Sequence, residues 1–143
     1  MFLGEYEYRL DQKGRIAIPP KVREEFQNGI VVTRGYDRCI VAYTPVEWNR
    51  LYERNAAMPT TDSSSRLINR LVFSGAFNLT LDRLGRLILP PSLRAYARIR
   101  EDVVIAGVGS YLEIWSREGW GKEQALMEEK ASEIAQGLGL GAQ

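Results

Sequence analysis

Hydrophobic and polar residues alternate along two stretches of the chain, and strict alternation predicts a strand with one buried face. The apolar positions are Tyr6, Tyr8 and Leu10 in the first stretch and Phe77, Leu79 and Leu81 in the second. Each stretch runs into an Asp-x-x-Gly-Arg motif, at residues 11–15 and 82–86. In each motif the Asp accepts from backbone amides and the Gly supplies a positive φ, which is typical of a hairpin turn with a glycine bulge. The turn-forming residues are therefore Asp11, Gly14, Asp82 and Gly85.

The two motifs belong to an internal duplication. Residues 11–23 align with residues 82–94 at an offset of 71, and six of the thirteen positions are identical. With one extra residue the match continues through Gly35 and Gly107, Tyr43 and Trp115, and Trp48 and Trp120. At about 45 residues, a single copy has too little apolar surface to fold alone. We therefore expect the two copies to bury each other around a pseudo-twofold axis.

Each copy predicts the same series of elements. After the turn, a second strand ends at a Pro-Pro pair, which suits the first turn of a short helix. Two more strands follow in each copy, so that the predicted fold class is α+β, mainly β, built from a duplicated βαββ unit. The predicted ranges are 15–18, 21–26, 30–34 and 39–43 in the first copy, and 86–89, 92–97, 103–106 and 111–115 in the second.

Helices connect and end the copies. Thr44-Pro45-Val46-Glu47 is a capping box with Pro at the first helical position, and Ser116 is the matching N-cap of a last helix over 117–136. Residues 55–65 indicate a loop that leads to a helix over about 64–73. We place a first domain at 5–47, a linker with its helix at 48–75, a second domain at 76–119, and a C-terminal helix with a fraying tail at 120–143.

The amino-acid composition excludes several classes of function. The 143 residues are 45% hydrophobic and 26% charged, which is globular composition, and no apolar run reaches the ~20 residues of a membrane span. Because there is no histidine and only one cysteine, histidine-based triads and the usual Cys/His zinc sites are excluded. We expect a soluble cytosolic protein that is not an enzyme and has no cofactor, metal or small-molecule substrate. Cys39 is interpreted as a small buried hydrophobe.

Charge is sorted along the chain, although the net charge is only +1. Residues 1–100 hold 16 Lys/Arg and 10 Asp/Glu, a net of +6, whereas residues 101–143 hold 3 and 8, a net of −5. Arginine supplies 15 of the basic residues, and its planar fork suits phosphates and guanine edges. Either these charges form ordinary surface ion pairs, or the protein has a basic front and an acidic C-terminal element.

Arg15 and Arg86 follow the turn glycines, on the strand face opposite the apolar positions. One interpretation is that each Arg pairs with its own turn Asp and braces the loop. The other is that the two turns present Arg side by side to the major groove of DNA, where a two-stranded ribbon fits and Arg reads guanine. The candidate DNA-binding residues are Lys13, Arg15, Arg86, Arg83 and Arg9.

Three further features have two interpretations each. Arg23 and Arg94 repeat just after the Pro-Pro pairs, and they either touch phosphate or pair with nearby acids. Trp48 and Trp120 occupy equivalent repeat positions and are core or subunit contacts. The apolar stripe around Met127 in the last helix is a subunit interface or plain core.

Over residues 1–136 the chain resembles the MraZ family of bacterial proteins, which are built of two SpoVT-AbrB-type swapped-hairpin domains. The resemblance rests on Met1-Phe-Leu-Gly4, on the two Asp-x-x-Gly-Arg turns, and on their Pro-Pro pairs. It implies an AbrB-like barrel in a nucleoid-associated transcriptional regulator, usually a repressor, of its own operon and of the division and cell-wall gene cluster. It also implies a ring-shaped homo-oligomer that binds G-rich direct repeats in double-stranded promoter DNA, with no membrane partner.

The family's DNA contacts fall here on Lys13, Arg15 and Arg86. The second turn has Leu84 where the first has Lys13, so the first turn carries more weight in this interpretation. Swapped-hairpin domains also occur in antitoxins that neutralise a partner toxin, which gives an alternative function as a protein-interaction module. Antitoxin chains usually have one copy and a disordered C-terminal tail, whereas this chain has two copies and a predicted C-terminal helix.

Overall fold

The structure is a computed structural model that describes residues 1–141. In chain order the elements are β1 (Glu5–Arg9), β2 (Arg15–Ala17), the short 3-10 helix η1 (Pro20–Phe26), β3 (Ile30–Arg34), β4 (Ile40–Tyr43), α1 (Pro45–Ala56), α2 (Ser63–Ser74), β5 (Phe77–Leu79), β6 (Arg86–Ile88), α3 (Pro91–Tyr96), β7 (Asp102–Gly107), β8 (Leu112–Ser116) and α4 (Arg117–Gly137). The predicted α+β class with mainly strands is confirmed, and most element boundaries lie within two residues of the expected ones. The last two residues of the expected tail lie outside the described residues.

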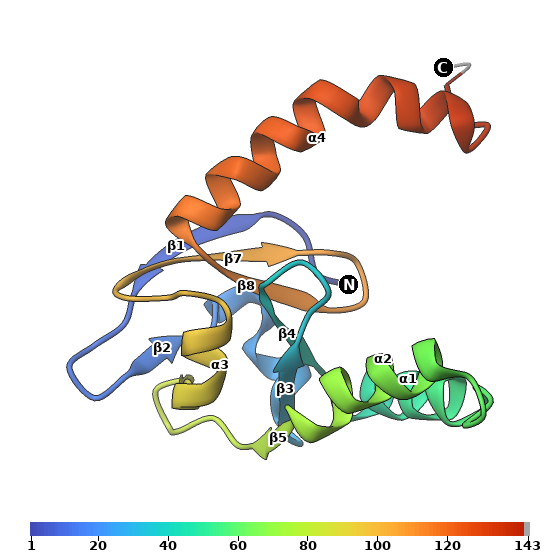
Figure 1. Ribbon diagram of the computed structural model, residues 1–143. Helices are drawn as coiled ribbons and strands as arrows, with labels where there is room; N and C mark the ends of the chain where they lie inside the picture. The colour runs from blue at the N-terminus through green and yellow to red at the C-terminus, as the bar shows by residue number, and fades with distance from the viewer. Residues whose placement is uncertain (142–143) are drawn as a thin grey trace.

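The two copies exchange their first strands. Six strands form an antiparallel sheet in the order β1-β7-β8-β4-β3-β5 (Figure 1). β1 of the first copy pairs with β7 of the second, with Glu5 opposite Ala106. In the same way β5 of the second copy pairs with β3 of the first, with Phe77 opposite Val32. The sheet is therefore shared by both halves.

β2 and β6 form a separate two-stranded antiparallel ribbon, in which Ile16 lies opposite Leu87. Each Asp-x-x-Gly-Arg turn has the local hydrogen bonds expected of a hairpin turn, since the N–H of Asp11 donates to the Arg15 carbonyl at 3.0 Å and the N–H of Asp82 donates to the Arg86 carbonyl at 2.8 Å. The flanking strands do not pair with each other, however, because β1 pairs with β7 and β5 pairs with β3. Strand alternation fixes which face is buried but not which neighbour accepts the hydrogen bonds. Here the other copy supplies the partner at both places.

The core lies between the ribbon and the large sheet, and both copies fill it. Ile16 and Ile18 of the first copy meet Leu87 and Leu89 of the second, and all four are at most 2% exposed. Burying one aliphatic side chain of this size stabilises a fold by ~1.5–3 kcal/mol. Because each copy buries its ribbon strand under the other, the mutual burial expected from the duplication is present.

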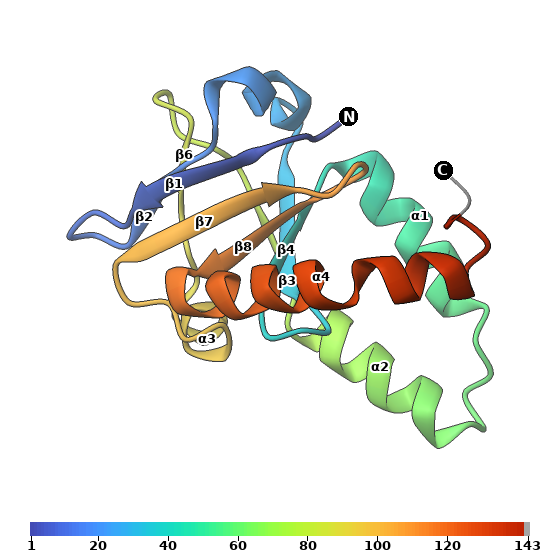
Figure 2. The same ribbon diagram turned by 90° about the horizontal axis from the view of Figure 1, so that it is seen from above.

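The helices are held to the sheet by equivalent tryptophans. Trp48 of α1 packs against Tyr43 and Phe73, with ring centroids 5.8 and 5.5 Å away. Trp120 of α4 packs against Trp115 at 5.7 Å. Figures 1 and 2 show α1 and α2 projecting together from one side of the sheet, while α4 starts at the end of β8 and extends away from it. Both tryptophans are contacts within one chain, and Cys39 is buried as expected.

Candidate nucleic-acid interface

The first Asp-x-x-Gly-Arg turn is organised around the carboxylate of Asp11. Its Oδ1 accepts hydrogen bonds from the backbone N–H groups of Lys13 (2.9 Å) and Arg15 (2.8 Å). Its Oδ2 accepts from Nε of Arg15 at 2.6 Å. The backbone N–H of Gly14 donates to the Asp11 carbonyl at 3.0 Å, and Gly14 has a φ of +76°. One carboxylate therefore fixes both the loop and the arginine that follows it.

The second turn repeats this geometry. Asp82 Oδ1 accepts from the backbone N–H groups of Leu84 and Arg86, both at 2.9 Å, and Oδ2 accepts from Arg86 Nε at 2.9 Å. Gly85 also has a φ of +76°. In both turns the accepted backbone N–H of the Arg is the main cause that lowers the pKa of the Asp, and the Arg side chain adds to it. Both carboxylates therefore stay ionised far below neutral pH.

The two turns lie at opposite ends of the β2–β6 ribbon. The N–H of Ile18 donates to the carbonyl of Gly85 at 2.9 Å, and the N–H of Leu89 donates to that of Gly14 at 3.0 Å. Because Arg15 lies opposite Ile88 and Ala17 lies opposite Arg86, the two arginines share the outer face of the ribbon as diagonal neighbours. Their side chains are 27% and 29% exposed.

The ion-pair interpretation of Arg15 and Arg86 describes the contacts that their side chains make within the chain. Each arginine braces its own turn through Nε, as the ion-pair interpretation expects. Bracing occupies one edge of the guanidinium. A terminal nitrogen of Arg86 lies 3.9 Å from Asp11 Oδ2, and the terminal nitrogens of Arg15 make no ion pair or hydrogen bond within residues 1–141. A braced guanidinium with a free terminal edge is positioned to donate to an acceptor above the ribbon.

Arg23 and Arg94 connect each copy to the turn of the other copy, a role that neither of their expected interpretations includes. Arg23 Nε donates to the carbonyl of Ile18 at 2.7 Å, and its guanidinium lies so close to Gly85 that a Cβ there would fall 2.6 Å from Cζ. A Cβ on Gly14 would lie 3.1 Å from Arg94 Nη1. In the sequence, this contact is signalled only by the repetition of Arg at equivalent positions. The strand exchange that brings each of these arginines to the turn of the other copy cannot be read from the sequence.

The remaining candidate DNA-binding residues differ in whether their side chains form ion pairs. Lys13 and Arg83 stand at the exposed tips of the turns, and no side-chain hydrogen bond or ion pair restrains either within the described chain. Leu84, at the position that matches Lys13, is 63% exposed. Arg9 instead pairs with Glu101, and its Nε lies 3.4 Å from Asp102. The structure thus brings four of the five candidate residues to the ribbon and its turns, and it engages Arg9 with two acids.

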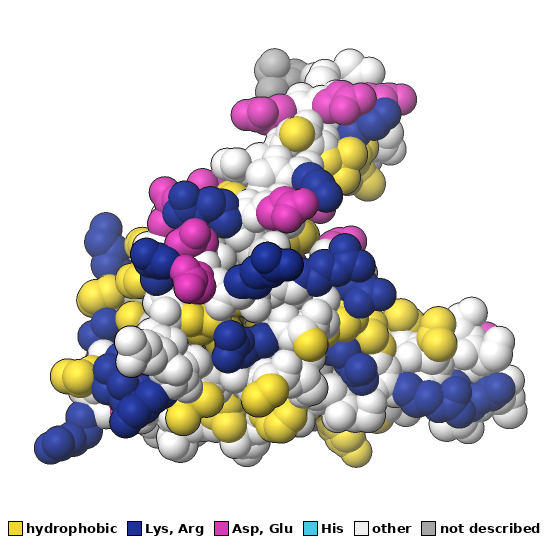
Figure 3. Space-filling model, turned by 60° about the vertical axis from the view of Figure 1, so that its left-hand side comes forward, with side chains coloured by type: hydrophobic (Ala, Val, Ile, Leu, Met, Phe, Trp, Pro, Cys, Tyr) yellow, Lys and Arg dark blue, Asp and Glu magenta, His cyan; other side chains and the backbone are white. Residues whose placement is uncertain are grey.

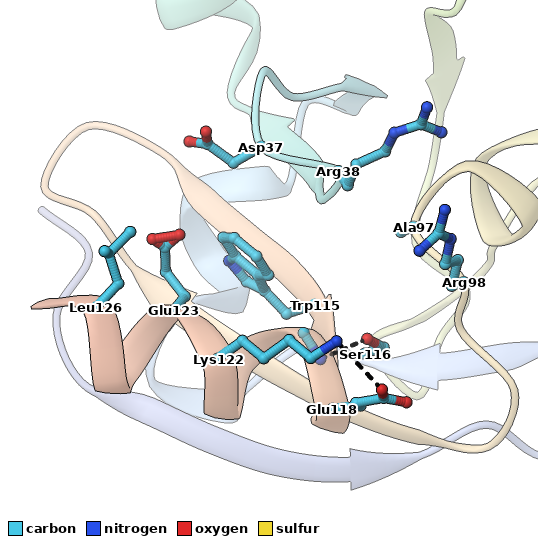
Figure 4. A pocket seen from close by; sticks show the side chains of 11 residues that line it. Asp37, Arg38, Ala97, Arg98, Trp115, Ser116, Glu118, Lys122, Glu123 and Leu126 are labelled. Carbon is cyan, nitrogen blue, oxygen red and sulfur yellow. Dashed lines mark hydrogen bonds and ion pairs between the residues drawn. The ribbon is translucent and has the colours of Figure 1, made fainter.

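Charge is sorted in space as well as along the chain. Figure 3 shows acidic side chains gathered along α4, while Lys and Arg dominate the body below it. A hollow of about 420 Å³ between these regions is lined by residues of the β3–β4 turn, of the segment that follows α3, of the end of β8 and of α4 (Figure 4). Its acids, Asp37, Glu118 and Glu123, balance its bases, Arg38, Arg98 and Lys122. This hollow therefore has no net charge that would select an anionic ligand.

The fold and the turns together define a duplicated α+β protein whose halves share one sheet and display basic turns. A family model described as "MraZ protein, putative antitoxin-like" matches it twice, at residues 1–71 and 72–137. The chain belongs to the MraZ family of transcriptional regulators. That is a class of regulators rather than of enzymes.

Several relatives carry the name "Transcriptional regulator MraZ". The protein from Herpetosiphon aurantiacus is 46% identical over 133 residues, which is 93% of this chain and 91% of the relative. The protein from Syntrophomonas wolfei is 46% identical over 138 residues, 96% of each chain. That from Thermomicrobium roseum is 42% identical over 138 residues, 96% of this chain and 97% of the relative. Within residues 1–141, no helix is both long and apolar enough to span a membrane.

Proposed function

We propose that this chain is a sequence-specific DNA-binding regulator that contacts promoter DNA with the outer face of the β2–β6 ribbon and its two turns. One observation carries the proposal: Arg15 and Arg86 are each held through Nε by the carboxylate of its own turn, and both lie on the same outer face of the ribbon. An arginine fixed in advance loses less side-chain entropy when it binds. Lys13 and Arg83 are exposed charges at the tips of the turns, suited to phosphate contact.

The finer regulatory role follows from the family. We propose repression of the protein's own operon and of the division and cell-wall gene cluster, through G-rich direct repeats in the promoter, in the cytoplasm at the nucleoid. The strand exchange between copies supports assignment of the fold to the swapped-hairpin, AbrB-like type. A bidentate Arg–guanine contact gives only ~1–3 kcal/mol of discrimination. An oligomeric ring would place several ribbons on repeated DNA boxes and convert later contacts into intramolecular ones.

A gel-shift titration with the DNA upstream of the protein's own gene tests the assignment of Arg15. We expect Arg15→Ala to weaken binding by about 5-fold to 150-fold per contact, the range that corresponds to 1–3 kcal/mol. Arg50→Ala is the matched control, because Arg50 is 71% exposed on α1 and, within residues 1–141, its ion pair is with Glu47 alone. Unchanged affinity for Arg15→Ala, or an equal loss for the control, would reject the proposed interface.

A further inference from the structure

Ile88 is a large apolar side chain on the outer face of the β2–β6 ribbon. The two strands turn alternate side chains into the core, which leaves four outer positions on the ribbon: Arg15, Ala17, Arg86 and Ile88. Ile88 is 58% exposed. In the duplication it matches Ala17, so the second copy places an isoleucine where the first has a much smaller side chain. A single exposed apolar side chain is ordinary on a protein surface, so its neighbours decide its role.

Ile88 is the direct cross-strand neighbour of Arg15. A ladder hydrogen bond joins Ile18 to Gly85 further along the ribbon. Because hydrogen-bonded and non-hydrogen-bonded pairs alternate along an antiparallel ladder, Arg15 and Ile88 form a non-hydrogen-bonded pair, in which the side chains are closest. The Cβ atoms of such a pair are about 4.5–5.5 Å apart. The isoleucine therefore stands beside the arginine whose terminal nitrogens make no ion pair or hydrogen bond within residues 1–141.

Ile88, Arg15 and Arg86 line one hollow of about 750 Å³ beside the ribbon. Residues 78–82, which run from β5 into the second turn, form its other wall. Among the described residues that line this hollow, Asp82 is the only acid, and its Oδ2 already accepts from Arg86 Nε at 2.9 Å. The hollow therefore joins two cationic side chains to an apolar one, and its carboxylate is already paired.

An apolar side chain beside an arginine that reads guanine suits one particular group of DNA. In the major groove thymine presents a C5-methyl group, which cytosine lacks, and apolar side chains contact it. Successive bases of one strand lie about 3.4 Å apart along the helix axis. A side chain about 5 Å from Arg15 therefore reaches the base beside the guanine that Arg15 contacts. A phosphate oxygen would instead be contacted by a polar or charged side chain.

We propose that Ile88 is a specificity-determining residue, which packs on the C5-methyl group of a thymine next to the guanine contacted by Arg15. The inference rests on the proposed function, because it needs the outer ribbon face to meet the major groove. It adds that the two ends of the ribbon read different sequences. The first-turn end pairs Arg15 with Ile88, whereas the second-turn end pairs Arg86 with the smaller Ala17. The thymine methyl group therefore matters most at the first-turn end.

Fluorescence anisotropy with deoxyuridine in place of thymine tests the contact, because this replacement removes only the methyl group. The three DNAs are the fragment upstream of the protein's own gene, the same fragment with every thymine replaced by deoxyuridine, and a scrambled fragment. The three proteins are the wild type, Ile88→Ala and Val46→Ala. Val46→Ala is the matched control, because Val46 is 61% exposed but lies on α1, on the opposite side of Figures 1 and 2 from β2.

For the wild type, deoxyuridine should weaken binding about fourfold per contacted thymine, the factor that corresponds to burial of one carbon group. Ile88→Ala should bind the native fragment more weakly than the wild type does, and it should bind the deoxyuridine fragment with the same affinity as the native one, because the methyl group has lost its partner. Val46→Ala should behave as the wild type does on all three DNAs.

A wild type that binds the native and deoxyuridine fragments equally would overturn the proposal, and so would an Ile88→Ala protein that keeps the whole penalty. Ile88→Ala should also sediment as the wild type does, and a changed assembly would assign Ile88 to a contact between copies instead. If the wild type does not prefer native to scrambled DNA, the proposed function fails and this inference fails with it. If that preference is present without a methyl effect, this inference alone fails.

Discussion

Replacing the glycines of the two turns with alanine should have unequal effects, because the arginine that covers each turn sits differently. Gly14 and Gly85 share a φ of +76°, and a residue with a Cβ in a left-handed conformation costs ~1–2 kcal/mol. At Gly14 the added methyl meets only the end of the flexible Arg94 side chain, at 3.1 Å. We therefore expect Gly14→Ala to lower the free energy of unfolding by ~1–2 kcal/mol.

At Gly85 the methyl group would overlap the guanidinium of Arg23, so that side chain must leave its place. Its departure breaks the hydrogen bond from Arg23 Nε to the carbonyl of Ile18, which adds about 1 kcal/mol. Gly85→Ala should therefore cost ~2–3 kcal/mol in total. In an Arg23→Ala background the same substitution should cost only ~1–2 kcal/mol, because nothing is left to displace.

Urea unfolding followed by circular dichroism, at one fixed protein concentration, measures these four variants. The ordering of the two single substitutions and the coupling between Arg23 and Gly85 both test the cross-copy contact. Equal costs for Gly14→Ala and Gly85→Ala, or a Gly85→Ala cost unaffected by Arg23→Ala, would show that Arg23 does not constrain the second turn.

Three further predictions concern the shared core, the separate halves and the turn carboxylates. Leu89→Ala should lower the free energy of unfolding by ~2–5 kcal/mol in a single transition, and two transitions in calorimetry would contradict the shared core. A chain of residues 1–71 alone should not show the native near-ultraviolet circular dichroism, because β3 and the buried face of β2 lose their partners; a folded monomer would count against mutual burial. The lowered pKa values of Asp11 and Asp82 mean that their stabilisation is complete above the ordinary Asp pKa and is lost as pH falls through the lowered values. The stability difference between wild type and Asp11→Asn/Asp82→Asn should therefore be constant from pH 6 to 8 and shrink below about pH 4, and a difference that grows on acidification would contradict it.

Strands, turns and helices could be predicted well from the sequence, but the pairing of strands and the contacts between the two copies could not. Alternation at Tyr6 and Tyr8, the turn motif and the Pro-Pro pairs are local signals, so they predict strands, turns and helix starts. Partner choice depends on which surfaces the folded chain brings together, and neither the exchange of β1 and β5 nor the reach of Arg23 to Gly85 is encoded locally. Periodicity around Met127 indicated an apolar stripe, but only the folded chain shows that the stripe is uncovered.

The same limit applies to the candidate site. The residue pattern placed Arg15 and Arg86 on the face opposite the core, where they are found. It offered bracing by the turn Asp as one of two interpretations. It could not show that bracing uses only one edge of each guanidinium and leaves the terminal nitrogens of Arg15 without a hydrogen bond or ion pair in residues 1–141, because that depends on side-chain geometry. It also could not show that Arg9 pairs with Glu101, which is 92 residues away in sequence.

Fluorescence anisotropy tests whether this chain recognises promoter sequence, with DNA from upstream of the protein's own gene, a scrambled DNA of the same composition, and two salt concentrations. We predict tight binding to the native DNA alone, weakened by salt through counterion release and weakened about 5-fold to 150-fold per contact by Arg15→Ala. Equal, weak binding to both DNAs that vanishes at the higher salt would contradict it. Arg15 and Arg86 would then be braces for their turns, and the alternative of a protein-interaction module would take first place.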